Sequence, residues 1–396
     1  MTPRKLLLLS YATLALAITG CGGGSAPEGG ISGTGAPEGT LRMSLADTPA
    51  CGFDAVNITV DRVRVNQSAS AGDSDAGWVD IAVTPPQRVD LLSLTNGVLF
   101  TLGETPLPTG TYTQMRLVLA ENDSADPLAN SVVPTGGVET PLTTPSAQQS
   151  GLKANIDIAV AQNQLADFVI DFDACRSVVS AGNSGKYLLK PVITVVPNFV
   201  SGVQGYVDLA IAGAQTLVSL EQDGVVVKST VPDITGKFLL EPVAPGTYDL
   251  VLSAPGRATA VVRKVAVASQ LVTDVNAQSD DLDPPASASG TIAGLVSMSL
   301  TPIDAVLSAD QVLSDGTTIE VGATPADSVT GAWSLQLPTA APVVAPYVAG
   351  TPLVFGADAA AAGKYTVLAA SGTSTQTSGP LTLASGATLD LDFTFP

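Results

Sequence analysis

The stretch that decides the fold is VNITVDRVRV, at residues 56–65. Apolar Val and Ile alternate there with polar residues, and a period of two places the two kinds of side chain on opposite faces of a β-strand. Similar runs occur at residues 39–45, 78–83, 112–120, 156–160, 168–172 and 187–195. Because no helical period of comparable strength occurs, we expect an all-β chain. Its first domain, residues 40–198, is predicted to be an antiparallel β-sandwich that buries one face of each strand.

The composition of the 396 residues narrows the function. With 45% hydrophobic and 13% charged residues the chain can bury a core, and 38 Gly and 28 Pro fit many strands joined by turns. The formal net charge of −19 opposes binding to nucleic acids, so we expect no such partner. There is no histidine, which excludes Ser-His-Asp and Cys-His catalysis and imidazole metal ligands. We therefore expect no catalytic residues and no enzyme activity.

The N-terminus predicts export. Basic Arg4 and Lys5 precede an apolar run at residues 6–18, which has the layout of a secretory signal and is too short to span a bilayer about 30 Å thick. The following ITGC, residues 18–21, resembles the bacterial lipobox. That resemblance implies a lipoprotein signal peptide at residues 1–20, cut before Cys21, which then carries diacylglycerol and a further acyl chain such as palmitate. An ordinary signal peptide with a cysteine nearby is the alternative.

The next segment fits a tether. Residues 21–39 are rich in Gly, Ser and Pro, as expected of a flexible connection between an anchor and a folded body. Gly22 follows the cysteine, whereas lipoproteins kept at the inner membrane have aspartate in that place. The resemblance therefore implies the outer rather than the inner membrane. We expect a protein of the bacterial cell envelope that reaches the membrane through its lipid.

Two further cysteines and three acids define a second candidate site. Exported chains meet an oxidising compartment, so we expect a disulfide bond between Cys51 and Cys175, with two unpaired buried thiols as the alternative. Asp171 and Asp173 share one face of a predicted strand. Asp47 lies four residues before Cys51, so the bond would bring it close to the other two acids.

Three carboxylates in one neighbourhood repel each other unless a cation joins them. We hypothesise a calcium-type site formed by Asp47, Asp171 and Asp173, and expect no other cofactor. Pairing of these acids with Arg176, Lys190 or water is the alternative.

Seven segments of the first domain, taken together and in order, resemble a bacterial lipoprotein family named only as domain of unknown function 4382. They are GTLRMSLADTPA (39–50), VNITVDRVRV (56–65), VDLLSLTNG (89–97), LPTGTYTQMRLVL (107–119), SGLKANI (150–156), DFVIDFDACRSVV (167–179) and KYLLKPVI (186–193). The resemblance implies no activity, because that family has no assigned function.

Residues 201–278 change character. They contain TGKF (235–238), PGTY (245–248) and APG (254–256), which resemble markers of the carboxypeptidase regulatory-like, or prealbumin-like, module. Alternation in this region predicts that Phe238 and Tyr248 point inward. The resemblance implies a small Greek-key β-sandwich.

A diverged copy of this module is predicted at residues 289–396, after a linker at 279–288 that begins with the acidic, proline-ended stretch SDDLDPP (279–285). TGAWSL, residues 330–335, parallels TGKFLL, residues 235–240, and Tyr365 parallels Tyr248. Between the two markers the copy carries a Pro/Ala-rich insertion. The chain is therefore expected to end in two smaller prealbumin-like Greek-key sandwiches.

These observations favour a lipid-anchored envelope protein with a structural or adhesive role, whose partner is an envelope polymer, a glycan or a protein. The alternative is a carbohydrate-binding lipoprotein similar to starch-binding proteins, which would need exposed aromatic side chains. Aromatic residues make up only 5% of the chain. Trp333 parallels Phe238 and is predicted to be in a core, and Trp78 precedes an alternating strand and is predicted to be buried. A row of exposed aromatics would favour the alternative.

Overall fold

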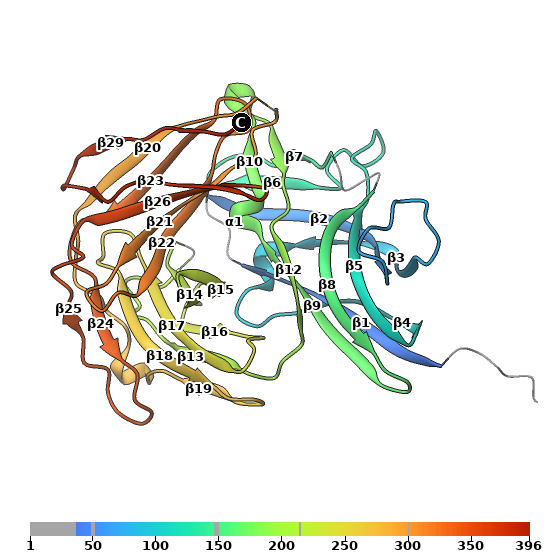
Figure 1. Cartoon of the computed structure of the whole chain (residues 1–396), viewed down its shortest axis with the longest axis horizontal. Coiled ribbons are helices and arrows are strands. Elements are labelled where there is room, and N and C mark those ends of the chain that lie inside the picture. The colour runs from blue at the N-terminus through green and yellow to red at the C-terminus, as the bar shows by residue number, and fades with distance from the viewer. Residues whose placement is uncertain (1–36, 49–51, 146–149, 214, 300) are drawn as a thin grey trace, which may run out of the picture. The chain divides into compact units, whose positions relative to one another are not determined.

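Alternating side chains produce strands along most of the chain that the structure describes, residues 37–48, 52–145, 150–213, 215–299 and 301–396 (Figure 1). The structure is a computed structural model. Helical segments in these residues are short: η1 (Leu91–Leu94), α1 (Ala174–Ser177), η2 (Gly182–Ser184) and η3 (Gln278–Asp280). The predicted all-β fold class is confirmed. The predicted signal peptide, Cys21, most of the tether and Cys51 lie outside the described residues.

Two sheets enclose one core in module one, residues 38–197. The smaller sheet has the order β12-β9-β1-β4: β12 (Ile193–Pro197), β9 (Leu165–Asp173), β1 (Glu38–Thr48) and β4 (Phe100–Pro108). The larger has the order β10-β11-β7-β6-β2-β5-β8, with β3 on β2: β10 (Val178–Ser180), β11 (Tyr187–Leu189), β7 (Thr140–Thr143), β6 (Ser131–Pro134), β2 (Phe53–Asn66), β5 (Gly110–Leu119), β8 (Leu152–Val160) and β3 (Val79–Asp90). Leu41, Ile58 and Phe172 are among its fully buried core residues.

The strand that decides the fold contains a β-bulge. The register of β2 against both β3 and β5 shifts between Val60 and Arg62. The alternation of residues 56–65 slips at the same place, and the extra residue turns Val63 and Val65 back toward the core. The irregularity of the pattern therefore corresponds to a real feature of the sheet.

Pairing within module one differs from a purely antiparallel sandwich at two places. β1 pairs with β9, and β7 with β11, in parallel. The single strand expected at residues 187–195 was also wrong, because the chain there forms β11 and β12 in different sheets. Pro191 lies between them and lacks the N–H that a continuous ladder needs.

Modules two and three repeat one topology. In module two, β16 (Lys237–Leu240), β13 (Gly202–Tyr206) and β19 (Val272–Asp274) form one sheet, and β15 (Val225–Thr230), β14 (Leu217–Gln222), β17 (Gly246–Ser253) and β18 (Ala260–Val267) follow in order in the other. In module three the matching sheets are β23 (Ala332–Pro338), β20 (Ser289–Ser297) and β29 (Thr388–Asp390), and β22 (Thr318–Pro325), β21 (Val306–Val312), β26 (Lys364–Ser371) and β27 (Ser374–Thr377). Two short strands, β28 (Leu381–Thr382) and β30 (Phe393–Thr394), pair with β26 and β20.

The sequence markers occupy equivalent places in the two copies. Phe238 on β16 and Trp333 on β23 are buried in their respective cores, as predicted. Tyr248 donates its hydroxyl hydrogen to the carbonyl of Ala244 over 2.9 Å, and the buried Tyr365 likewise donates to a backbone carbonyl. Gly236 opens the β16 marker at φ +80°, where a Cβ atom would lie 2.3 Å from a backbone oxygen, so the turn requires glycine there.

The Pro/Ala-rich insertion of module three crosses to module two. Its strand β24 (Val343–Pro346) pairs in parallel with β18, and β25 (Gly356–Ala357) then pairs with β24. Val343 packs into the core of module two, while Val251 and Val261 of module two pack into the core of module three. The two modules therefore exchange parts of their cores.

The segment predicted as a linker, residues 279–288, packs against module two. Leu282 is buried, and its N–H donates to the carbonyl of Tyr206 over 2.9 Å. The N–H of Ala258 donates to the carbonyl of Pro285 over 2.8 Å. This segment fixes the passage of the chain between modules two and three.

Candidate functional site

The parallel pairing of β1 with β9 places Asp47 beside Asp171 and Asp173, but on the other face of the sheet. Asp47 lies opposite Phe172, whose side chain is in the core, whereas Asp171 and Asp173 flank Phe172 and belong to the opposite face of β9. Asp47 and Asp171 are buried. The charges of Asp171 and Asp173 still act on Asp47, but the three carboxylates do not converge on one face of the smaller sheet of module one.

Asp47 is bound by the backbone of α1 rather than by a basic side chain of the described residues. One carboxyl oxygen, Oδ1, accepts from the N–H of Ala174 over 3.2 Å, and Oδ2 is buried with no hydrogen-bond partner among the described residues. Burial raises the pKa of Asp47 well above its usual range, and the charges of Asp173 and Asp171 raise it further. The surroundings of Asp47 therefore disfavour its charged form.

Asp171 has a cationic partner from module two. The ammonium nitrogen of Lys228, on β15, lies 2.6 Å from Oδ1 of Asp171, and both side chains are buried. A cavity of about 90 Å³ adjoins the pair. Removing either charge would leave the other buried and uncompensated, which is costly in the low-dielectric interior.

Asp173 and Arg176 connect module one to module three. Asp173 caps α1 by accepting from the N–H of Arg176 over 3.0 Å. The guanidinium of Arg176 lies 3.4 Å from the carboxylate of Asp173 and also donates to Glu320 on β22. Burial raises the pKa of Asp173 to about 6, although Arg176 acts in the opposite direction.

Glu221 and Asp310 complete the cluster from modules two and three. Glu221 accepts from the N–H of Glu320 over 2.8 Å and from the hydroxyl of Ser219 over 3.0 Å. Burial raises its pKa to about 8, and the charge of Glu320 adds to this. Burial, together with the charge of Glu320, also raises the pKa of Asp310 to about 7. Both acids therefore titrate near neutral pH.

We call this cluster the charged junction. It comprises Asp47, Asp171, Asp173 and Arg176 of module one, Glu221 and Lys228 of module two, and Asp310 and Glu320 of module three. Among the described residues, no group of three or more Asp, Glu and Cys side chains is arranged to hold a metal ion. The calcium hypothesis stays a prediction, and the ion pairs with Lys228 and Arg176 supply positive charge at the same acids.

The remaining predicted residues lie as follows. Lys190, a predicted alternative partner of the acids, has its ammonium group 3.8 Å from Asp304 and donates to the carbonyl of Ile303, both in module three. Cys175 lies on α1, whereas Cys51 lies outside the described residues, so their disulfide bond stays a prediction.

The two tryptophans do not form an exposed row. Trp333 is in the core of module three. Trp78 is half-buried in module one, with the guanidinium groups of Arg64 and Arg116 each 4.9 Å from its ring centroid. Its indole N–H donates to the carbonyl of Gly72 over 2.8 Å. Neither tryptophan therefore supports a flat aromatic platform.

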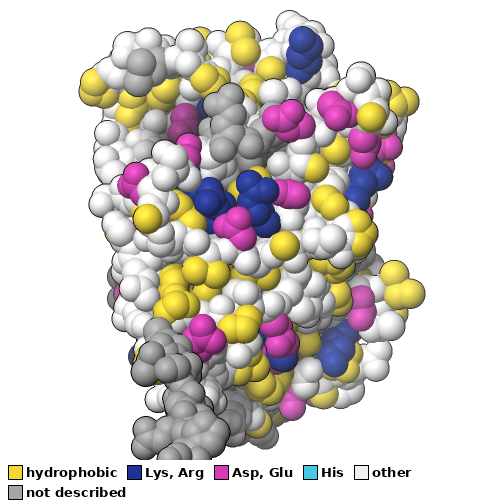
Figure 2. All heavy atoms as spheres, turned by 90° about the vertical axis from the view of Figure 1, so that its right-hand side faces the viewer, with side chains coloured by type: hydrophobic (Ala, Val, Ile, Leu, Met, Phe, Trp, Pro, Cys, Tyr) yellow, Lys and Arg dark blue, Asp and Glu magenta, His cyan; other side chains and the backbone are white. Residues whose placement is uncertain are grey.

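Charges on the surface of module one are mixed. Figure 2 shows Lys and Arg side chains beside Asp and Glu side chains, with hydrophobic side chains between them. Arg42 pairs with Glu104 over 2.5 Å, and Arg64 pairs with Asp80 over 2.8 Å. In the described parts of the chain, no helix is both long and apolar enough to cross a membrane.

Comparison with known proteins supports part of the sequence-based resemblance. Residues 38–191 match the family described as Domain of unknown function (DUF4382). No curated protein matches the chain. The carboxypeptidase regulatory-like resemblance of modules two and three stays a prediction.

Three solved structures share weak similarity with the chain. A type II cohesin-X-dockerin complex from Acetivibrio cellulolyticus aligns at 24% identity over 20% of this chain and 53% of that chain, with a TM-score of 0.16. The Bacillus anthracis TIE protein aligns at 12% identity over 90% and 50%, with a TM-score of 0.18. BcpA, the major pilin subunit of Bacillus cereus, aligns at 11% identity over 90% and 99%, with a TM-score of 0.16. The alignments span about half of the first two chains, and scores this low carry no functional argument.

Proposed function

We propose that this chain is a non-catalytic protein of the bacterial cell envelope that is held to the outer membrane by a lipid on Cys21 and acts as a structural or adhesive unit. The observation that carries the proposal is the way its modules are joined. Lys228 and Asp171 link modules one and two, Arg176 and Glu320 link modules one and three, and modules two and three exchange parts of their cores. Modules that lack buried contacts of this kind are expected to move independently of one another.

A body of joined modules on a flexible tether would be suited to presenting its surface away from the membrane. The Gly/Ser/Pro-rich segment at residues 21–39 would let the body extend from the membrane. Contacts buried between modules would then keep their relative positions fixed under mechanical load. Neither feature requires a reacting group, in keeping with the absence of histidine from the sequence.

Cooperative unfolding tests the rigid body. Differential scanning calorimetry of the mature chain carrying C21S should show one transition, because the modules share buried contacts. Separate transitions for module one and for the C-terminal modules would contradict the proposal. Attachment of cells that produce the full chain, compared with cells that produce equal amounts of C21S protein, tests the adhesive role. We expect attachment to fall with C21S.

Export and lipidation have their own test. In a bacterial host fed an alkyne analogue of palmitate, the wild-type chain should be labelled and recovered with the outer membrane, and C21S should be unlabelled and released. Alkylation of the unreduced protein followed by mass spectrometry should find Cys51 and Cys175 protected. An unlabelled wild-type chain, or freely alkylated cysteines, would reject the corresponding part of the proposal.

A further inference from the structure

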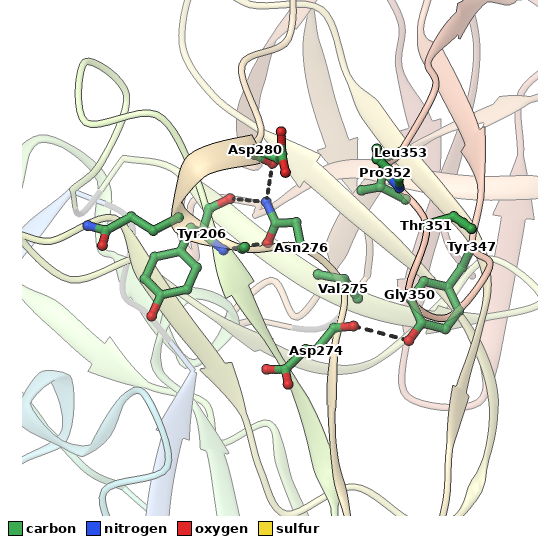
Figure 3. A pocket seen from close by; sticks show the side chains of 12 residues that line it. Tyr206, Asp274, Val275, Asn276, Asp280, Tyr347, Gly350, Thr351, Pro352 and Leu353 are labelled. Carbon is green, nitrogen blue, oxygen red and sulfur yellow. Dashed lines mark hydrogen bonds between the residues drawn. The ribbon is translucent and has the colours of Figure 1, made fainter.

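A pocket of about 540 Å³ lies between the insertion of module three and the ends of two strands in the smaller sheet of module two (Figure 3). Tyr206 at the end of β13 and Asp274 at the end of β19 contribute one side. The loop of residues 347–353, which lies between β24 and β25, contributes the other. The pocket therefore exists only because the insertion has folded onto module two.

Two tyrosines lie on opposite sides of this pocket. Figure 3 shows the ring of Tyr206 on one side and the ring of Tyr347 on the other, with Asp274, Val275 and Asn276 between them. Both tyrosines are half-buried. The space between two separated aromatic faces can accept a flat, partly apolar ligand.

Hydrogen bonds hold both tyrosines in place. The hydroxyl of Tyr347 donates to the backbone carbonyl of Asp274 over 3.0 Å. Asn276 accepts from the N–H of Tyr206 over 2.8 Å, and its amide nitrogen donates to the carbonyls of Tyr206, over 2.8 Å, and of Asp280, over 2.9 Å. The walls are therefore set before a ligand binds, which lowers the entropy cost of binding.

The polar groups of the pocket can form hydrogen bonds with the hydroxyl groups of a ligand. Among the described residues, the carboxylate of Asp274 accepts one hydrogen bond, from Gln204 over 2.6 Å at Oδ1, which leaves Oδ2 as an acceptor. The exposed side chain of Gln278 and the hydroxyl of Tyr206 have no protein partner among the described residues and can donate or accept. The lining contains the carboxylates of Asp274 and Asp280 and no Lys or Arg, so an anionic ligand would be repelled.

We propose that this pocket binds a neutral saccharide, with a sugar ring held between the aromatic faces of Tyr206 and Tyr347 and its hydroxyl groups bonded to Asp274, Gln278 and Asp280. A volume of about 540 Å³ is in the range of small-ligand sites and accommodates one or two sugar rings. This assigns a ligand class to the seam between modules two and three. It goes beyond the structural or adhesive role and does not depend on lipid anchoring.

The test uses the mature chain carrying C21S. An array of neutral gluco-, galacto-, manno- and xylo-oligosaccharides is screened, and the strongest hit is titrated by calorimetry against the chain and its variants. We expect Y206A and Y347A each to weaken binding by about tenfold or more, as for a central aromatic contact. Y206F keeps the ring and should stay within about threefold. V348A, an exposed residue of the same loop outside the pocket lining, should bind like the parent chain.

Each result of this experiment either supports or overturns the saccharide proposal. Thermal melting monitors folding, and if an alanine variant of a tyrosine unfolds, D280A and Q278A replace it, because both side chains are exposed. Loss of affinity in the pocket variants but not in V348A supports the proposal. No binding to any neutral saccharide overturns it, as does undiminished binding by the folded variants. Binding only of choline, used as a small cationic probe, would also overturn it and assign a cation site.

Discussion

Two sets of contacts join module two to its neighbours, and they differ in chemistry. In the charged junction, Lys228 and Glu221 are buried beside charged groups of modules one and three. At the other contact, which we call the exchange seam, β24 pairs with β18, Val343 enters the core of module two, and Val251 and Val261 enter the core of module three. The first therefore depends on proton binding, whereas the second rests on apolar burial and backbone hydrogen bonds.

The two contacts therefore contribute differently: the ion pairs favour one arrangement of the modules, and the apolar contacts stabilise it. Buried charges lose their hydration, so a buried ion pair contributes little net stability but penalises every arrangement that separates the partners. Apolar burial stabilises at every pH at which the chain stays folded. Substitutions in the two regions should accordingly differ in size and in pH dependence.

The largest effect is expected from breaking the ion pair of Lys228 with Asp171. K228A leaves the carboxylate of Asp171 buried without its partner, which should lower the free energy of unfolding by about 3–5 kcal/mol. Urea unfolding followed by circular dichroism measures this. The double variant K228M/D171L removes both charges and should recover most of the loss.

A matched control is K364A, because Lys364 is exposed on β26. Its free energy of unfolding should stay within about 0.5 kcal/mol of the parent value. If K228A proves as mild as K364A, the pair does not hold modules one and two together.

The exchange seam should respond more weakly and without dependence on pH. V343A removes two methyl groups from the core of module two and should destabilise the chain by about 1–2 kcal/mol at both pH 5 and pH 8. V354A, on the same insertion but 77% exposed, should have no measurable effect. If the loss of stability caused by V343A changed strongly between the two pH values, the charged junction and the exchange seam would not differ in the way proposed.

The charged junction should make the chain less stable at alkaline pH. Glu221, Asp310 and Asp173 have pKa values raised to about 8, 7 and 6, so between about pH 4 and pH 8 the folded chain binds more protons than the unfolded chain. Stability from these groups is therefore present at low pH and is lost as pH rises through the folded-state values. Melting temperatures between pH 5 and pH 8.5 should fall.

E221Q tests which group is responsible. Glutamine keeps an oxygen for the N–H of Glu320 and an amide for Ser219 but does not titrate. We expect E221Q to melt higher than the parent chain at pH 8.5 by roughly 2 °C, for an effect on the order of 1 kcal/mol, and to match it at pH 5. Parallel melting curves at all pH values would show that Glu221 does not carry the pH dependence.

Much of the fold could be predicted because alternation and turn residues act locally. The strand at residues 56–65 and the repeated markers around Phe238 and Trp333 came from the sequence, and even the bulge in β2 left a slip in the pattern. The parallel pairing of β1 with β9 could not be predicted, because residues far apart in the chain set it. The pairing of β24, from the insertion of module three, with β18 of module two could not be predicted for the same reason.

The candidate sites show the same limit. The cysteine spacing predicts that Asp47 lies close to Asp171 and Asp173, but it says nothing of Lys228 and Glu320, which belong to other modules and carry no sequence signal of their contacts with Asp171 and Arg176. The sequence does not predict the tyrosine pocket, because Tyr206 and Tyr347 line it together only after the insertion has folded onto module two. A tyrosine in an otherwise Pro/Ala-rich insertion was the one available signal.

The smallest expected effect concerns calcium. Lys228 and Arg176 already place positive charge beside Asp171 and Asp173, and burial raises the pKa of Asp47, so a calcium ion would have to displace the buried ion pair of Asp171 and the partly buried ion pair of Asp173. We expect calcium at millimolar concentration to change the melting temperature by less than about 1 °C relative to the same buffer with EGTA. A larger rise that disappears in D171N would show that the ion displaces Lys228, and would reverse the interpretation of this cluster from a junction between modules to a metal site.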